Sequence, residues 1–135
     1  MAPRYLLDTN IIIYLRQKRS PAASARFDRL EPEDSAISVI TYGDLVYGAA
    51  KSQQTELVLS GLEQLISIIP VLPLPEAAGK TYGVLRAALA TRGNVIGTND
   101  LWIAAHALAS GLTLVTNNER EFRRIKDLKV ENWTK

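Results

Sequence analysis

Three aspartates stand where short apolar segments give way to helix-like patterns, and hydroxyl or amide side chains surround each of them. They are Asp8, Asp44 and Asp100. A fourth apolar run, residues 114–118, ends in a threonine and two asparagines instead of an acid. In an open α/β sheet, ligands collect outside the carboxyl ends of the parallel strands. The chain has no cysteine, and oxygen ligands converging at such an edge would suit Mg²⁺ or Mn²⁺.

Each acid by itself also has a structural explanation. Asp8 and Asp100 lie at predicted helix starts, where an acid caps the helix or interacts favourably with its dipole. Asp44 follows Thr41 at the spacing of a capping box. Capping does not, however, require three acids at one sheet edge, where like charges raise at least one pKa unless a cation neutralises them. The residues alone leave both interpretations open: helix caps, or metal-assisted phosphoryl chemistry.

Other catalytic patterns are missing from the sequence. His106, the only histidine, lies six residues after Asp100 and does not share its helix face, so we expect it to pack inside the fold. No serine has the surroundings of a nucleophile elbow, and the glycines form no phosphate loop. Hydrolysis by a metal-activated water therefore suits this chain better than covalent catalysis.

The elements that must position the acids alternate between strands and helices. Strands are predicted over residues 5–7, 36–40, 68–73, 112–116 and 130–133. Helices are predicted to begin after Asp8 and to cover residues 21–30, 41–50, 55–66, 75–89 and 100–110, the last capped by Thr98 or Asn99. This alternation predicts an α/β fold with a central, mostly parallel sheet flanked by α-helices.

Length and composition indicate one domain, residues 1–135. No apolar stretch reaches the roughly 18 residues of a membrane span, and no signal peptide is predicted, so we expect a cytoplasmic protein. The net charge of +2 does not by itself indicate nucleic acid binding. Basic clusters are explained most simply as solvated surface, and RNA contact is the weaker interpretation; they contain Arg16, Lys18, Arg19, Arg123 and Arg124.

Four segments form a recognisable series: LLDTNIIIYL, SVITYGDLVYGAAKS, GNVIGTNDLWIAAHALASG and LTLVTNNEREFRRIKDLKVENW. In this order and spacing they resemble PIN-domain ribonucleases, and closely the VapC toxins of bacterial toxin–antitoxin pairs. The resemblance covers essentially the whole chain. It implies a PIN-like fold and a Mg²⁺- or Mn²⁺-dependent endoribonuclease.

The resemblance also assigns roles to residues. Asp8 and Asp100 match the principal metal ligands of the family, and Asp44 stands where the family usually has glutamate. Since a glutamate is one methylene longer, Asp44 predicts either reduced activity or metal contact through water. The fourth position, acidic in many PIN domains, is matched by Thr116 with Asn117 or Asn118, and Asn118 is the catalytic candidate. The expected supporting residues are Thr9, Asn10, Thr116, Asn117 and Glu121, the last near enough to substitute for the missing acid.

The family's partners are implied in the same way. We expect a homodimer, and a VapB-type antitoxin whose C-terminal segment covers the acidic groove with an arginine near the carboxylates. Structured RNA is the implied substrate, with tRNA, including the anticodon stem-loop of initiator tRNA, the first to try. Two alternatives stay open: a weakened PIN-like domain that binds RNA or antitoxin without cutting, and a receiver-like signalling domain, which the spacing of the acids disfavours.

Overall fold

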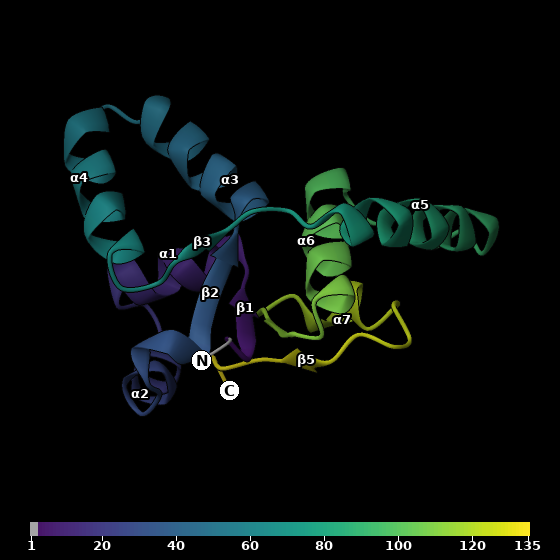
Figure 1. Cartoon of the computed structure of the whole chain (residues 1–135). Helices are drawn as coiled ribbons and strands as arrows, with labels where there is room; N and C mark the ends of the chain where they lie inside the picture. Colours follow the sequence, from purple (N-terminus) through teal and green to yellow (C-terminus); the bar gives the residue numbers. More distant parts are fainter. Residues whose placement is uncertain (1–2) are drawn as a thin grey trace.

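In the computed structural model, which describes residues 3–135, five parallel strands form one sheet in the order β3-β2-β1-β4-β5 (Figure 1). The strands are β1 (Tyr5–Leu7), β2 (Ser35–Ser38), β3 (Val71–Leu72), β4 (Thr113–Val115) and β5 (Val130–Glu131). The predicted α/β fold with a central parallel sheet is confirmed. The predicted domain also includes Met1 and Ala2, which lie outside the described residues.

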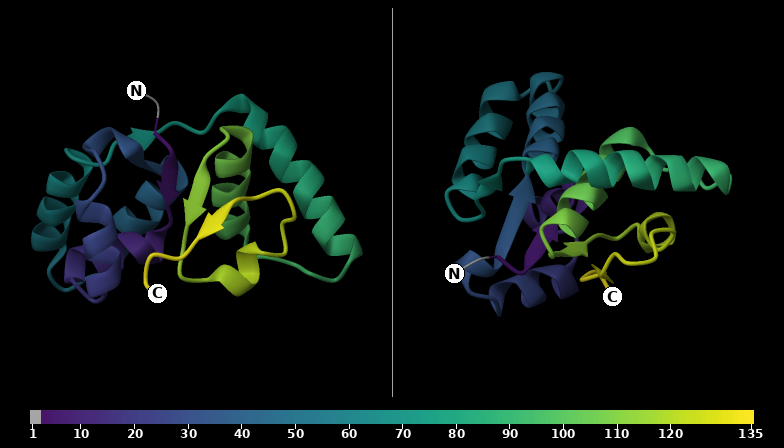
Figure 2. Two further views of the ribbon diagram at one scale, coloured as in Figure 1. Left: turned by 90° about the horizontal axis from the view of Figure 1, so that it is seen from below. Right: turned by 45° about the vertical axis from the view of Figure 1, so that its right-hand side comes forward.

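Seven α-helices flank the sheet in the described part of the chain. They are α1 (Thr9–Gln17), α2 (Pro21–Asp28), α3 (Val39–Ala50), α4 (Thr55–Ile66), α5 (Glu76–Thr91), α6 (Thr98–Ala109) and α7 (Glu119–Phe122). Figure 1 and the right-hand view of Figure 2 place the α3–α4 hairpin on one side of the sheet and α5 with α6 on the other. Over residues 3–135, no helix combines the length and the apolar character needed to cross a membrane.

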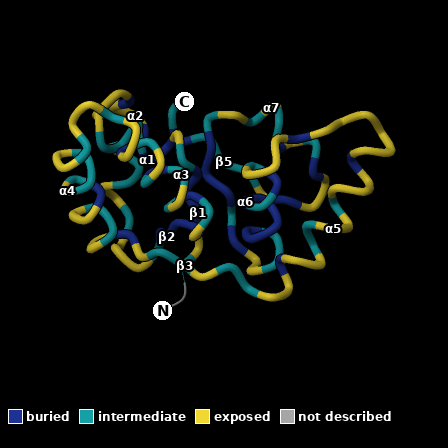
Figure 3. The backbone as a smooth tube through the Cα atoms, turned by 90° about the horizontal axis from the view of Figure 1, so that it is seen from above, coloured by how far each residue is buried: buried dark blue, intermediate teal, exposed yellow. Residues whose placement is uncertain are grey.

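Alternate side chains of the central strands enter two separate cores. Leu6 of β1 and Leu114 of β4 pack with α5, α6 and α7, whereas Leu7 and Val115 pack on the opposite face with helices α1 to α4. Because both faces are covered, β1 is apolar throughout instead of alternating with polar residues. The buried backbone in Figure 3 accordingly runs along β1 and α6, while much of α4 and α5 is exposed.

Two predicted helix starts are wrong, with consequences for the acids. Strand β2 ends at Ser38 and not at Ile40, because the Ser38 hydroxyl accepts the Ile40 N–H at 3.1 Å and caps α3. Thr41 is therefore buried inside α3, so the capping box that we expected Thr41 to form with Asp44 is absent. Helix α6 begins after Gly97 without a side-chain cap, so the caps predicted at its start do not form.

The other differences are smaller. The edge strand predicted over residues 68–73 is limited to Val71–Leu72, consistent with the prolines on either side, which cannot donate to a sheet ladder. The sequence pattern predicts neither the short helix α7 nor the 3₁₀ turn at Pro32–Asp34.

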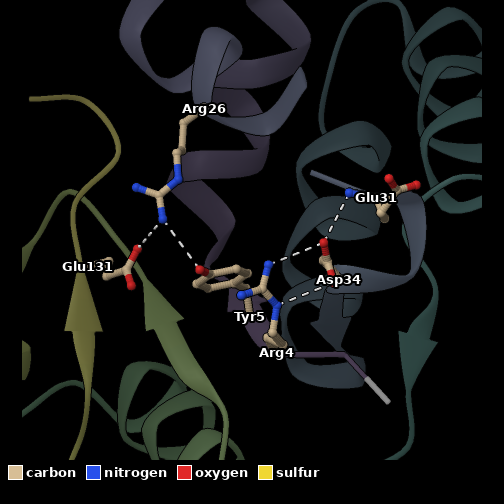
Figure 4. Close-up of polar contacts among 6 residues, drawn as sticks. All are labelled: Arg4, Tyr5, Arg26, Glu31, Asp34 and Glu131. Carbon is tan, nitrogen blue, oxygen red and sulfur yellow. Dashed lines mark hydrogen bonds and ion pairs between the residues drawn. The ribbon is translucent and has the colours of Figure 1, made fainter. Parts of the chain in front are cut away.

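Paired charges tie the end of the chain to its first strand (Figure 4). Arg26 of α2 donates to the Tyr5 hydroxyl at 3.3 Å and pairs with Glu131 of β5 at 3.1 Å. Arg4 pairs with Asp34 at 3.3 Å, and the same carboxylate accepts a backbone N–H at 3.0 Å. These acids are therefore neutralised by neighbouring arginines, unlike those described next.

Candidate metal and active site

The sheet order places a crevice at the carboxyl ends of β1 and β4. The chain continues from β1 to β2 on one side, and β4 lies on the other side, which makes this the switch point where open α/β sheets bind ligands. Asp8 follows β1 directly, and Thr116 follows β4. The first turn of α6 brings Asp100 to the same edge, where the charge of Asp8 is close enough to raise the pKa of Asp100.

Asp8 is buried and held in place. Its Oδ1 accepts the Ile11 N–H at 2.9 Å, so the predicted role as cap of α1 is confirmed. Burial raises its pKa from 3.8 to about 6, opposed by hydrogen bonds from Thr116 and from the backbone of Ile11 and Asn10. The Asn10 side chain itself is exposed. Asp8 is thus a fixed acid whose charge has no basic partner among the groups that shift its pKa.

Asp100 lies at the centre of the acidic group. It is partly buried, and burial makes the largest contribution in raising its pKa from 3.8 to about 7. The Glu121 carboxyl is within hydrogen-bonding reach, and the charges of Glu121, Asp8 and Asp44 raise the pKa further. The carboxylates do gather at one edge of the sheet, with the electrostatic cost that such a gathering implies.

Asn118, the candidate at the fourth position, contacts both Glu121 and Thr116. The Asn118 amide donates to Glu121 Oε2 at 3.3 Å, and its backbone N–H bonds the buried Thr116 hydroxyl at 2.9 Å. Asn117, between them in sequence, is partly buried. The other oxygen of Glu121, Oε1, is buried without a hydrogen-bond partner. A buried, unpartnered carboxylate oxygen beside Asp100 is a natural ligand for a cation.

Asp44 lies within α3 and uses both of its oxygens. Oδ2 accepts the Thr9 hydroxyl at 3.1 Å, and Oδ1 accepts the Asn99 amide at 2.7 Å. Sequence reasoning assigned Thr9 a supporting role but missed Asn99, which it treated as a helix cap. The available signal was its position directly before Asp100.

His106 packs in the interior, as expected. It is 1% exposed, and its Nδ1 lies 2.8 Å from the Ser38 hydroxyl. Burial lowers its pKa. The ring thus links α6 to the end of β2 and is engaged in the core instead of facing the acids.

The basic residues named as RNA-binding candidates differ in their surroundings. Arg16, in the last turn of α1, lines a surface cavity of about 260 Å³ whose lining also includes Asp44, and its guanidinium lies next to Gly61 of α4. Lys18 and Arg19 are exposed at the end of α1. In the C-terminal cluster, by contrast, the guanidinium groups bind the protein itself: Arg123 pairs with Glu119 at 2.8 Å, and Arg124 donates to a backbone carbonyl at 2.9 Å.

The donors at this edge suit a hard divalent cation. Asp8, Asp100 and Glu121 offer carboxylate oxygens, their charges are mutually unfavourable, and one oxygen lacks any partner. Among residues 3–135, no three His, Cys, Asp or Glu side chains converge as a ready-made ligand group. In proteins, Mg²⁺ usually retains several waters and is bound mainly through carboxylates.

Comparisons with known proteins agree with this geometry. The PIN domain family matches residues 5–128. Ribonuclease VapC1 of Haemophilus influenzae (strain R2866) is 43% identical over 132 residues, which is 97% of this chain and 98% of that protein. The tRNA(fMet)-specific endonuclease VapC of Shigella flexneri is 40% identical over 131 residues, again 97% of this chain and 98% of that protein.

Solved structures show the same fold. DNA-bound VapBC from Salmonella typhimurium matches with a TM-score of 0.91 at 39% identity, covering 97% of this chain and 98% of that chain. VapBC-1 from nontypeable Haemophilus influenzae matches with a TM-score of 0.89 at 42% identity, with the same coverage. The resemblance expected from the motifs is confirmed, and the chain belongs to the PIN-domain family and, within it, to the VapC proteins.

Proposed function

We propose that this chain is a Mg²⁺- or Mn²⁺-dependent endoribonuclease and the toxin of a VapBC-type toxin–antitoxin pair. The observation that carries the proposal is the group of unpaired acids at the switch point, with a buried Glu121 oxygen that has no partner. The names of the relatives, ribonuclease and tRNA(fMet)-specific endonuclease, support the reaction and make initiator tRNA the first substrate to test.

Asp8, Asp100 and Glu121 would hold the ion. When bound, a divalent cation polarises the scissile phosphate and lowers the pKa of bound water, which is the chemistry that phosphodiester hydrolysis needs. The chain's own residues position these groups. The Ile11 N–H and Thr116 fix the Asp8 carboxylate, and Asn118 fixes one oxygen of Glu121. The other Glu121 oxygen, Oε1, accepts no hydrogen bond and would be the one left to contact the ion.

The proposal extends to partners. The two similar structures named above are of VapBC, which supports a VapB-type antitoxin for this chain. The homodimer is proposed from the family resemblance alone. Large apolar side chains are exposed on three helices and offer contact surface: Tyr47 of α3, Leu57 of α4 and Val84 of α5. An antitoxin arginine placed near the unpaired acids would neutralise them much as a cation does. Arg16, which lines a surface cavity with Asp44, is a candidate to contact an RNA phosphate.

The test is cleavage of total tRNA and of tRNA(fMet) by the purified chain, in Mg²⁺, Mn²⁺ or EDTA. Asp8→Asn removes the charge but keeps the helix cap, because asparagine caps as well as aspartate. Asp127→Ala is the matched control, since Asp127 lines a cavity at the other end of α6. We expect metal-dependent cleavage by the wild type and the control, and none by Asp8→Asn.

Two results would overturn the proposal: cleavage that persists in EDTA, or cleavage by Asp8→Asn at the wild-type rate. If the wild type retains tRNA but does not cut it in any metal, the alternative of a PIN-like domain that only binds RNA is favoured.

A further inference from the structure

Asp44 differs from the other acids in what its oxygens contact. Each oxygen accepts a hydrogen bond from a different side chain, the Thr9 hydroxyl at 3.1 Å and the Asn99 amide at 2.7 Å. By contrast, no N–H or hydroxyl group of the protein donates a hydrogen bond to Glu121 Oε1. Asp44 is therefore engaged by the protein through both of its oxygens.

The two donors lie next to Asp8 and Asp100 in the sequence. Thr9 is the first residue of α1 and follows Asp8, while Asn99 lies in the first turn of α6 and precedes Asp100. One side chain of α3 thus ties together the first turns of α1 and α6. Because ligand groups must be held within about 0.5 Å of their working positions, such a link bears directly on how the two carboxylates meet.

We propose that Asp44 is a positioning residue and not a metal ligand, and that it acts through Thr9 and Asn99 to fix Asp8 and Asp100, which bind the ion with Glu121. This inference rests on the proposed metal site but not on RNA cleavage. It makes Asn99 as important for the site as Asp44, although Asn99 carries no charge and is exposed.

The test measures Mn²⁺ affinity of the metal-free full chain by isothermal titration calorimetry. The variants are Thr9→Val, Asn99→Ala, Asp44→Ala and the double variants that combine Asp44→Ala with each of the others. Thr91→Val is the matched control, because its hydroxyl bonds only a carbonyl of exposed α5. We expect each single variant to weaken Mn²⁺ binding by roughly 10-fold, as loss of an outer partner does. In the Asp44→Ala background, neither second change should weaken it further, because the shared partner is already gone.

Three results would overturn the inference. In the first, Asp44→Ala loses more than about 100-fold in affinity while Thr9→Val and Asn99→Ala stay within twofold, which is the behaviour of a direct ligand. In the second, the losses add in the double variants. In the third, all three single variants lower the melting temperature in EDTA without changing Mn²⁺ affinity, which means that the contacts are only structural.

The outcome does not depend on the proposed nuclease activity. If the wild type cuts no RNA but the affinities follow the expected pattern, the positioning role stands and the proposed function falls. If the wild type cuts RNA but the affinities follow any of the three overturning patterns, the proposed function stands and the positioning role falls.

Discussion

Carboxylates in two regions of the molecule have opposite surroundings. Beside the N-terminal strand, Asp34 pairs with Arg4, and Glu131 pairs with Arg26 (Figure 4). A hydrogen bond from Arg4 makes the largest contribution in holding the pKa of Asp34 below its usual value. Each of these acids pairs with an arginine, so it contributes to the fold without an external ligand.

At the carboxyl edge of the sheet, the acids face one another. Burial raises the pKa of Asp8 to about 6 and that of Asp100 to about 7, and neighbouring carboxylates contribute to the second shift. A fold that can pair its acids with arginine in one place leaves them unpaired in another. Such unpaired, partly buried acids are destabilising by themselves and mark functional sites. Carboxylates thus have a structural role in the first region, whereas in the second they are available to bind a ligand.

Removing one acid from each region should give the largest difference in activity. Asp100→Asn should lower RNA cleavage by more than about 100-fold, beyond the loss of an outer partner of a metal site. Asp34→Asn, in the paired region, should stay within about twofold, because surface pairs contribute roughly 0–1 kcal/mol. Initial rates on the same tRNA in Mn²⁺ measure both. Equal losses would mean that the two regions do not differ in function.

Metal binding should raise the free energy of unfolding, and this rise should depend on Asp100 but not on Asp34. At a Mn²⁺ concentration about 100 times its dissociation constant, the free energy of unfolding should rise by about 2.7 kcal/mol. Denaturant unfolding with and without EDTA measures this rise. It should vanish in Asp100→Asn and persist in Asp34→Asn. A rise that survives in Asp100→Asn would place the ion elsewhere.

Without metal, the two regions should respond to charge removal with opposite signs. Asp8→Asn keeps its cap and removes an unpaired buried charge, so it should raise the free energy of unfolding in EDTA at pH 8 by about 1–2 kcal/mol. Glu131→Gln removes the partner of Arg26 and should lower it by up to about 1 kcal/mol. Urea unfolding of both variants provides the measurement. Destabilisation by Asp8→Asn would show that its charge is already compensated in the metal-free protein.

Much of this arrangement could be predicted from the sequence. Short apolar runs locate the strands, and an acid directly after β1 locates Asp8 at the sheet edge, because these signals are local. The family motifs then identify the fold. The start of α3 was harder, since its cap, Ser38, sits within a β-branched run that reads as continuous strand.

The contacts that complete the site could not be predicted in this way. The hydrogen bond between Asn99 and Asp44 joins residues 55 positions apart, and only the packing of α3 against α6 brings them together. Helix α7 is four residues long, which is too short for a periodic pattern to show which side chains in and next to it point toward the site. The sequence therefore offered both Asn118 and Glu121, and the structure shows the amide supporting the acid.

The smallest expected effect concerns His106, which is buried like Asp8. Unlike an acid, a histidine becomes neutral when it loses its proton, so burial favours the neutral ring. Its pKa lies below the usual 6.5, so the native state resists a proton that the unfolded state takes up. Its contribution to stability is therefore complete above pH 6.5 and is lost as the pH falls through and below that value. Between pH 7.5 and 5.5 in EDTA, the wild type should lose up to about 1 kcal/mol more unfolding free energy than His106→Gln. Comparing the two proteins cancels the titration of the carboxylates, which both retain. Parallel pH profiles would mean that the pKa of His106 is the same in the native and the unfolded state.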